Sequence, residues 1–245
     1  ITARAVLVAA LDGNPLDVVF HLAAVHGGPT VPRVNTGGTE AVLSAASDAG
    51  VPRIVFASSA AVYGQAREYP TPERHDLAPI TPYGLSKRFG EHLCATMATS
   101  IRLRLANVYG PRQRDDGEGG IVAILARHAR EGTRPTIYGG NQTRDFVHVD
   151  DVVRAFLLAA DSPATGAYNI GTGRETRIRT LATMVHAHAR VPNDPATWPL
   201  FNTARPNDIL RSSLDCRAAD CTFGWRPAVK LEDGLAKMMA ITVAL

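Results

Sequence analysis

Short apolar runs alternate along the chain with longer segments whose apolar residues recur at helical spacing. Dense apolar runs at residues 17–24 and 53–58 predict two buried parallel strands, and shorter runs at 101–105 and 167–170 predict two more. Helical spacing predicts helices at 2–11, 38–49, 82–96, 120–131, 150–160, 176–190 and 231–243. Strands that alternate with helices are joined by right-handed crossovers. The pattern therefore predicts an α/β fold with a doubly wound parallel sheet.

Length and composition agree with such a fold and exclude other classes. With 245 residues, 45% of them hydrophobic, the chain can form one large domain with a smaller lobe. Its 26 basic and 23 acidic residues are mixed along the chain, which argues against a nucleic-acid surface. No apolar stretch approaches the ~20 residues that span a bilayer, and no signal peptide opens the sequence. Three cysteines form no even framework, so we expect a cytoplasmic protein with no membrane partner.

The segment from Tyr83 to Lys87, with the sequence YGLSK, carries the strongest chemical signal. Four residues on a helix place both side chains on one face. Tyrosine is a weak base at its reference pKa of ~10, so we expect the Lys87 ammonium to lower the pKa of Tyr83. This pattern alone occurs by chance in many chains. Here Ser59 precedes it in SSAAVYG, directly after a predicted strand, where parallel sheets bind ligands.

Six motifs occur in order along the chain: HLAA at 21–24, SSAAVYG at 58–64, PYGLSK at 82–87, NVYGPRQ at 107–113, RDFVHVDD at 144–151 and NIGTG at 169–173. Their order and spacing resemble the extended short-chain dehydrogenases/reductases, within the NAD-dependent epimerase/dehydratase family. The closest likeness is to nucleotide-sugar epimerases of the UDP-glucose 4-epimerase type. The resemblance covers essentially the whole chain and implies a Rossmann-type sheet, an NAD cofactor, a nucleotide-sugar substrate and a homodimer.

The resemblance also implies roles for particular residues. Ser59, Tyr83 and Lys87 would be the catalytic trio. The implied cofactor-binding residues are Leu22, Ala23, Ala24, Asn35, Ser58, Tyr83 and Lys87. The implied substrate-binding residues are Ser59, Asn107, Tyr138, Arg144 and Arg205.

Within that second set, Asn107 would meet the sugar diphosphate, Arg144 and Arg205 would pair with its phosphates, and Tyr138 would stack on the base. The two arginines and the tyrosine each have an alternative interpretation. Arg144 and Arg205 could form surface ion pairs, and Tyr138 could be a packed core residue. Arg205 stands in R-P-N-D, where the family usually has R-x-G-D.

The motifs assign residues 1–108 and 144–172 to a dinucleotide-binding domain, and 109–143 and 173–245 to a nucleotide-sugar-binding lobe. A dinucleotide fold needs a first strand that runs into a Gly-rich turn, where helix amides hold the pyrophosphate. No such turn opens this sequence. We therefore expect that the first part of the fold is missing from it. The segment between Ala24 and Asn35 is also several residues shorter than the family usually has.

The residues after Ser59 decide between reactions. Family members that eliminate water, and those that remove a carboxyl group, carry acidic residues there, whereas this chain has Ala60 and Ala61. We therefore expect epimerisation at C4 of a UDP-hexose through a transient keto sugar. A dehydratase, or a dehydrogenase or reductase of the same family, remains the enzymatic alternative, and a non-catalytic ligand sensor the other. His186 and His188 lie two apart on one predicted helix, face different directions and predict no metal site.

Overall fold

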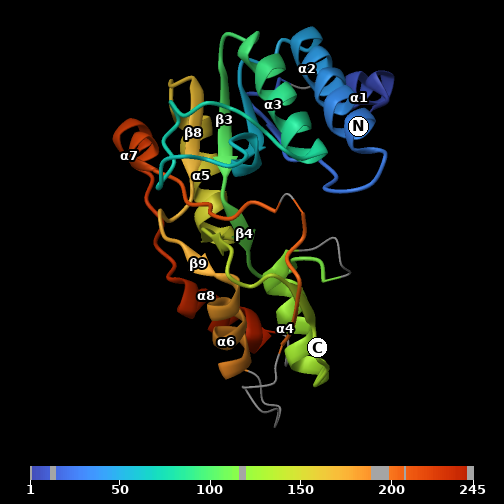
Figure 1. Cartoon of the computed structure of the whole chain (residues 1–245). Helices are drawn as coiled ribbons and strands as arrows, with labels where there is room; N and C mark the ends of the chain where they lie inside the picture. The colour runs from blue at the N-terminus through green and yellow to red at the C-terminus, as the bar shows by residue number, and fades with distance from the viewer. Residues whose placement is uncertain (1, 12–14, 116–119, 189–198, 207, 242–245) are drawn as a thin grey trace.

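A four-stranded parallel sheet forms the centre of the larger part of the molecule (Figure 1). The computed structural model describes residues 2–11, 15–115, 120–188, 199–206 and 208–241. The strands are β1 (Val19–His21), β2 (Ile54–Ser59), β3 (Ser100–Leu105) and β8 (Gly166–Ile170), in the order β1-β2-β3-β8. All three pairings are parallel, which confirms the predicted sheet.

Helices cover both faces of this sheet. Successive residues of β2 point to opposite faces, so its alternate side chains pack against different helices. Ile54 and Phe56 pack in one core with residues of α2 (Gly38–Asp48) and α3 (Pro82–Ala95). Val55 and Ala57 pack in a second core with residues of α5 (Val149–Asp161). Two helices precede α2 in the chain: α1 (Arg4–Leu11), which packs on α2, and the π-helix η1 (Pro32–Gly37). The doubly wound arrangement follows from this alternation.

A third core lies in the lobe drawn in the lower half of Figure 1. It is built from α4 (Ile121–Glu131), α6 (Ile178–Ala187) and α8 (Leu231–Ile241). The described residues also form three two-stranded sheets: β4 (Asn107–Tyr109) with β7 (Phe146–His148), β5 (Thr136–Tyr138) with β10 (Leu200–Asn202), and β6 (Thr143–Arg144) with β9 (Thr176–Arg177). A further helix, α7 (Arg217–Phe223), packs near β8. The domain boundaries drawn from the sequence stay a prediction.

The helix predicted at 2–11 begins at Arg4, and two further predicted elements differ from the structure by two residues or more. The strand predicted at 17–24 contains only Val19–His21, because β1 pairs with β2 over three residues and the chain then leaves the sheet. The helix predicted at 176–190 begins at Ile178, since Thr176 and Arg177 pair with β6 as β9. Residues 189 and 190 of that prediction, like 242 and 243 of the last predicted helix, lie outside the described residues.

The described part of the chain contains no helix that is both long and apolar enough to cross a membrane. Among the same residues, no group of three or more His, Cys, Asp or Glu side chains is placed to hold a metal ion.

Candidate active site

The carboxyl end of β2 meets the first turn of α3. Thr81 caps this helix, because its hydroxyl accepts a hydrogen bond of 3.0 Å from the Gly84 amide, and Pro82 fills the first turn. Ser59 ends β2 and caps the short 3-10 helix η2 (Ala60–Val62) by accepting from the Ala61 amide at 3.2 Å. Gly84 allows the two turns to touch, since a Cβ there would lie 2.5 Å from the Ala61 carbonyl oxygen.

The three predicted catalytic side chains come together at this junction. The Ser59 hydroxyl lies close enough to the Tyr83 phenol to lower its pKa. Lys87 lies one turn further along α3, with its Nζ 5.7 Å from the centre of the Tyr83 ring and 4.9 Å from that of Phe56. The same ammonium donates a hydrogen bond of 2.7 Å to the Ala57 carbonyl. Strand β2 therefore holds α3 in a fixed register.

Burial controls the protonation of this trio. It raises the pKa of Tyr83 to about 12, and the nearby Ser59 hydroxyl offsets part of that rise. Burial also lowers the pKa of Lys87 to about 8. The expectation that Lys87 lowers the pKa of Tyr83 is therefore wrong for this structure. Both groups have lost water around them, and the ammonium is directed at the Ala57 carbonyl.

The segment that follows β1 lies beside the trio. Leu22 and Ala23 are exposed, and Ala24 is half-buried. The imidazole of His26 stacks on the Tyr83 ring, with the ring centres 4.4 Å apart and an angle of 23° between the planes. Sequence reasoning missed His26, because it lies in the shortened segment and outside every motif.

Asn35 connects this segment to α3 by hydrogen bonds. Its Oδ1 accepts from the Val25 amide at 2.8 Å, and its Nδ2 donates to the Val25 carbonyl and to Ser86 Oγ, each at 2.9 Å. Asn35 is buried, so its side chain holds the segment next to the expected cofactor. A direct contact between Asn35 and the cofactor stays a prediction.

The side chain of Ser58 is directed away from the edge of the sheet. It is 2% exposed and donates a hydrogen bond of 2.5 Å to Glu91 Oε1 on α3. The side chain is thus already hydrogen-bonded to Glu91, and a contact between Ser58 and the cofactor stays a prediction.

The predicted substrate-binding residues gather on the lobe side. Arg144 is half-buried and forms an ion pair of 2.7 Å with Asp208. Arg205 is exposed and lies over the Tyr138 ring, 4.8 Å from its centre. Asn107 is exposed at the start of β4. The ion pair of Arg144 is the alternative that the sequence left open, and the exposure of Tyr138 excludes a packed core position.

The segment 208–210 connects the two sides of the site. Gln65, which follows the SSAAVYG motif, donates to the Asp208 carbonyl at 2.8 Å and accepts from the Leu210 amide at 3.2 Å. Asp208 also accepts from Arg144 of β6. The segment thus touches both the loop after β2 and the lobe.

Asp145 is a further residue that sequence reasoning missed. It is fully buried beside Arg144 and accepts hydrogen bonds from the amides of Thr172, Gly173 and Leu214. Burial raises the pKa of Asp145, and these hydrogen bonds offset the rise. The residue holds the NIGTG loop against the start of β7. Its position inside the RDFVHVDD motif was the one available signal.

A family model described as the NAD dependent epimerase/dehydratase family matches residues 1–171. The chain belongs to this family. A protein of Mycolicibacterium smegmatis named UDP-glucose 4-epimerase is 40% identical over 238 residues, which cover 90% of this chain and 74% of that relative.

Solved structures agree with this membership. The crystal structure of a UDP-glucose 4-epimerase from Thermotoga maritima with UDP-glucose superposes with a TM-score of 0.92 at 32% identity, over 99% of this chain and 82% of that one. The Thermus thermophilus UDP-glucose 4-epimerase complex with NAD gives a TM-score of 0.87 at 30% identity, over 98% and 81% of the two chains.

The residues at the sheet edge fit the NAD of this family. A phenol and an ammonium lie together where β2 ends, and an exposed apolar surface formed by Leu22 and Ala23 lies after β1. A flat ring with an attached ribose needs these two kinds of surface side by side. Tyr83 and Lys87 would hold the ribose, and residues 22–24 would lie against the ring.

The lowered pKa of Lys87 makes a prediction about pH. The side chain is charged below about pH 8 and loses its charge as the pH rises through that value. A Lys87→Arg variant keeps its charge throughout, because the arginine pKa exceeds 12. The ratio of kcat between parent and variant should therefore fall as the pH rises from 7 to 9. Steady-state rates across this range test it, and a constant ratio would contradict it.

Proposed function

We propose that this chain catalyses NAD-dependent epimerisation of a nucleotide sugar, at C4 of a UDP-hexose. One observation carries the proposal. Ser59, Tyr83 and Lys87 meet at the edge of the sheet, while Ala60 and Ala61 occupy the turn that follows Ser59. An alanine neither donates nor accepts a proton, so this turn offers no acid for elimination. The names of the relatives from M. smegmatis and T. maritima support the same reaction.

The residues of the chain handle the proton. Ser59 lies beside Tyr83 and would hydrogen-bond the sugar hydroxyl, so that the proton would move between two oriented oxygens. NAD held by Tyr83 and Lys87 would supply reversible hydride transfer, and its positive charge would favour the phenolate of Tyr83. Tyr83 removes the hydroxyl proton and later gives it back. A pKa raised to about 12 keeps Tyr83 protonated, so removal of the sugar proton would need the positive charge that NAD brings.

The lobe would hold the nucleotide. Arg144 and Arg205 come from distant segments and lie near Tyr138, a grouping that suits a diphosphate with an attached base. Asn107 lies at the start of β4, beside the strand that follows Arg144. We also place the protein in the cytoplasm, since its three cysteines are free thiols.

The reaction itself can be tested with the full-length protein and a panel of UDP-, dTDP- and GDP-sugars. We expect a product of unchanged mass, identified by NMR as the C4 epimer, without net formation of reduced cofactor. Tyr83→Phe should lower kcat by ~10²–10⁴, the usual contribution of a general acid–base group. Tyr168→Phe is the control, because the Tyr168 hydroxyl donates to the Thr165 carbonyl.

Each alternative function has its own outcome in that experiment. Loss of one water from the sugar would favour a dehydratase, and accumulation of reduced cofactor a dehydrogenase. Binding without turnover of any sugar would favour a sensor. Parent-like activity of Tyr83→Phe would remove Tyr83 from the mechanism.

The diphosphate role of Arg144 can be tested by binding. Each charge-assisted hydrogen bond contributes about 1.5–3 kcal/mol, so Arg144→Ala should raise the Kd for UDP by about 10- to 100-fold. Uridine, which lacks the phosphates, should bind parent and variant alike. Arg211→Ala is the control, since Arg211 likewise pairs with a carboxylate, through two hydrogen bonds to Glu175. Calorimetry measures both ligands, and an unchanged Kd for UDP would leave Arg144 with the ion pair to Asp208 as its role.

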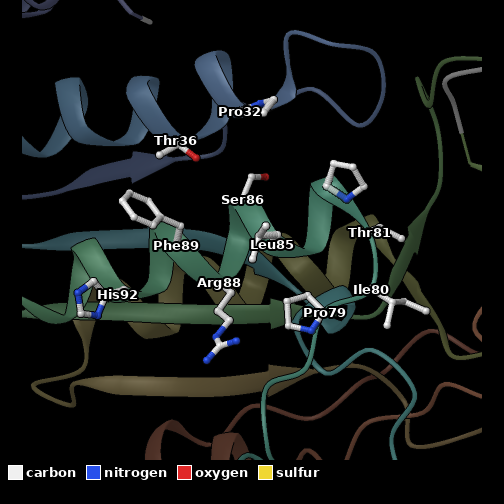
Figure 2. A pocket seen from close by; sticks show the side chains of 11 residues that line it. Pro32, Thr36, Pro79, Ile80, Thr81, Leu85, Ser86, Arg88, Phe89 and His92 are labelled. Atoms are coloured by element: carbon white, nitrogen blue, oxygen red, sulfur yellow. The ribbon is translucent and has the colours of Figure 1, made fainter.

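We propose a homodimer that forms through the outer face of α3. Leu85 and Phe89 lie one turn apart on this helix and are 58% and 44% exposed, and Ile80 nearby is 43% exposed. They line a groove of about 730 Å³ that also borders η1 (Figure 2). A cluster of exposed large apolar residues is typical of a protein interface. A second copy suits it, because a two-fold axis would bring the same helix of each subunit together.

Phe89→Glu should convert this dimer to a monomer, because the interface would bury two unpaired carboxylates. Leu200→Glu is the control, since Leu200 lies in the lobe and is 47% exposed. Light scattering after size-exclusion chromatography measures the mass of each variant. A parent that is monomeric, or a Phe89→Glu variant that stays dimeric, would contradict the proposed interface.

A further inference from the structure

A row of polar side chains crosses the sheet one residue inside its carboxyl edge. In the parallel register Ser58 of β2 pairs with Arg104 of β3, and Arg104 pairs with Asn169 of β8. All three are buried, with exposed fractions of 6% or less. Paired residues of neighbouring strands point to the same face, here the face that α3 covers. A polar row at this depth has to be fully hydrogen-bonded.

Glu91 of α3 is hydrogen-bonded to two members of this row. Its carboxylate accepts two hydrogen bonds from Arg104, at 2.9 Å from Nε and 2.8 Å from Nη2, and one from Ser58 at 2.5 Å. The side chains of Glu91 and Arg104 are each only 7% exposed. The fork of the guanidinium matches the two carboxylate oxygens, so the geometry allows little rotation of either partner.

The remaining donors of Arg104 extend the row. Nη1 donates to Tyr63 Oη at 2.9 Å and to the Glu73 carbonyl at 3.0 Å. Tyr63 donates in turn to Asn169 Oδ1 at 2.7 Å. Burial raises the pKa of Tyr63 to about 12, so it stays a neutral donor.

The spacing of residues along α3 connects this polar row to the predicted catalytic residues. Tyr83, Lys87 and Glu91 are four residues apart and share one face of the helix. The last three residues of β2 each face one of them, since Ala57 accepts from Lys87, Ser58 donates to Glu91, and the Ser59 hydroxyl lies beside the Tyr83 phenol. Slippage of α3 along β2 would break all three contacts together.

We propose that Arg104, Glu91 and Ser58 are positioning residues that fix α3 on β2 and thereby set the distance between Ser59 and Tyr83. The role rests on the proposed function, because it concerns the proton transfer between these two groups. The row lies beneath the sheet edge, away from the side chains on the lobe that would bind the nucleotide. Loss of the row should therefore lower kcat more than it weakens substrate binding.

Arg104→Lys tests the geometry without removing the charge that Glu91 needs. A lysine cannot reproduce the fork or the bonds to Tyr63 and Glu73. We expect kcat to fall about 10- to 100-fold, as for a misplacement of reacting groups by roughly 1 Å, with KM within about three-fold of the parent. Ser58→Ala removes one hydrogen bond and should lower kcat by about 2- to 10-fold.

Arg226→Lys is the matched control, because Arg226 pairs with Asp220 on the surface. Rates are divided by the number of active sites, counted by calorimetric titration with UDP, so that unfolded protein does not enter kcat. A lower kcat with an unchanged KM in both test variants, and not in the control, supports the positioning role. A parent-like kcat per active site, or a raised KM with unchanged kcat, would overturn it.

If Arg104→Lys does not fold, Ser58→Ala decides by the same criteria. Absence of turnover in the parent would overturn the proposed function and the positioning role with it. A parent that epimerises its substrate, together with variants of equal kcat, would overturn the positioning role alone.

Discussion

The buried ion pair between Glu91 and Arg104 is the interaction on which the site depends. Removing water from two charges is unfavourable, and their attraction compensates only when the geometry is close and every remaining donor is satisfied. Here the pair meets both conditions through Ser58, Tyr63 and a backbone carbonyl. A shift of α3 along β2 would break these hydrogen bonds, so the pair favours one register of helix and sheet, and that register sets the positions of Ser59, Tyr83 and Lys87.

The same low-polarity environment acts on the catalytic groups. It favours the neutral phenol of Tyr83 and weakens the charge on Lys87, so the site by itself resists the charge separation that proton removal requires. Ser59 offsets only part of this effect. Catalysis in such a site needs charges that arrive with the bound molecules, which suits a reaction that begins only when cofactor and sugar are both present.

The sequence predicted the fold and the proximity of Ser59, Tyr83 and Lys87 because both follow from local rules, whereas the catalytic roles stay a prediction. Apolar runs identify β2 and β3, helical spacing identifies α3, and a four-residue interval places Tyr83 and Lys87 on one face. It could not predict the row across the sheet, because pairing between Ser58, Arg104 and Asn169 depends on a register among three strands. The short strands of the lobe were not predicted either, because two or three residues are too few to show a hydrophobic period.

Arg144 is a residue through which both the lobe and the loop after β2 would affect nucleotide binding. Its guanidinium makes three hydrogen bonds within the protein: Nη1 donates to the carbonyls of Thr143 and Ile209, and Nη2 donates to Asp208. A guanidinium carries five N–H donors, so a phosphate could be bound without breaking the ion pair. The carboxylate would nevertheless repel the phosphate, and the net affinity would be the difference between these two effects. Gln65 holds the backbone of Asp208 and Leu210, so the loop after β2 sets how close that carboxylate stands to Arg144. The loop that follows the catalytic serine would thereby also influence how tightly the nucleotide binds.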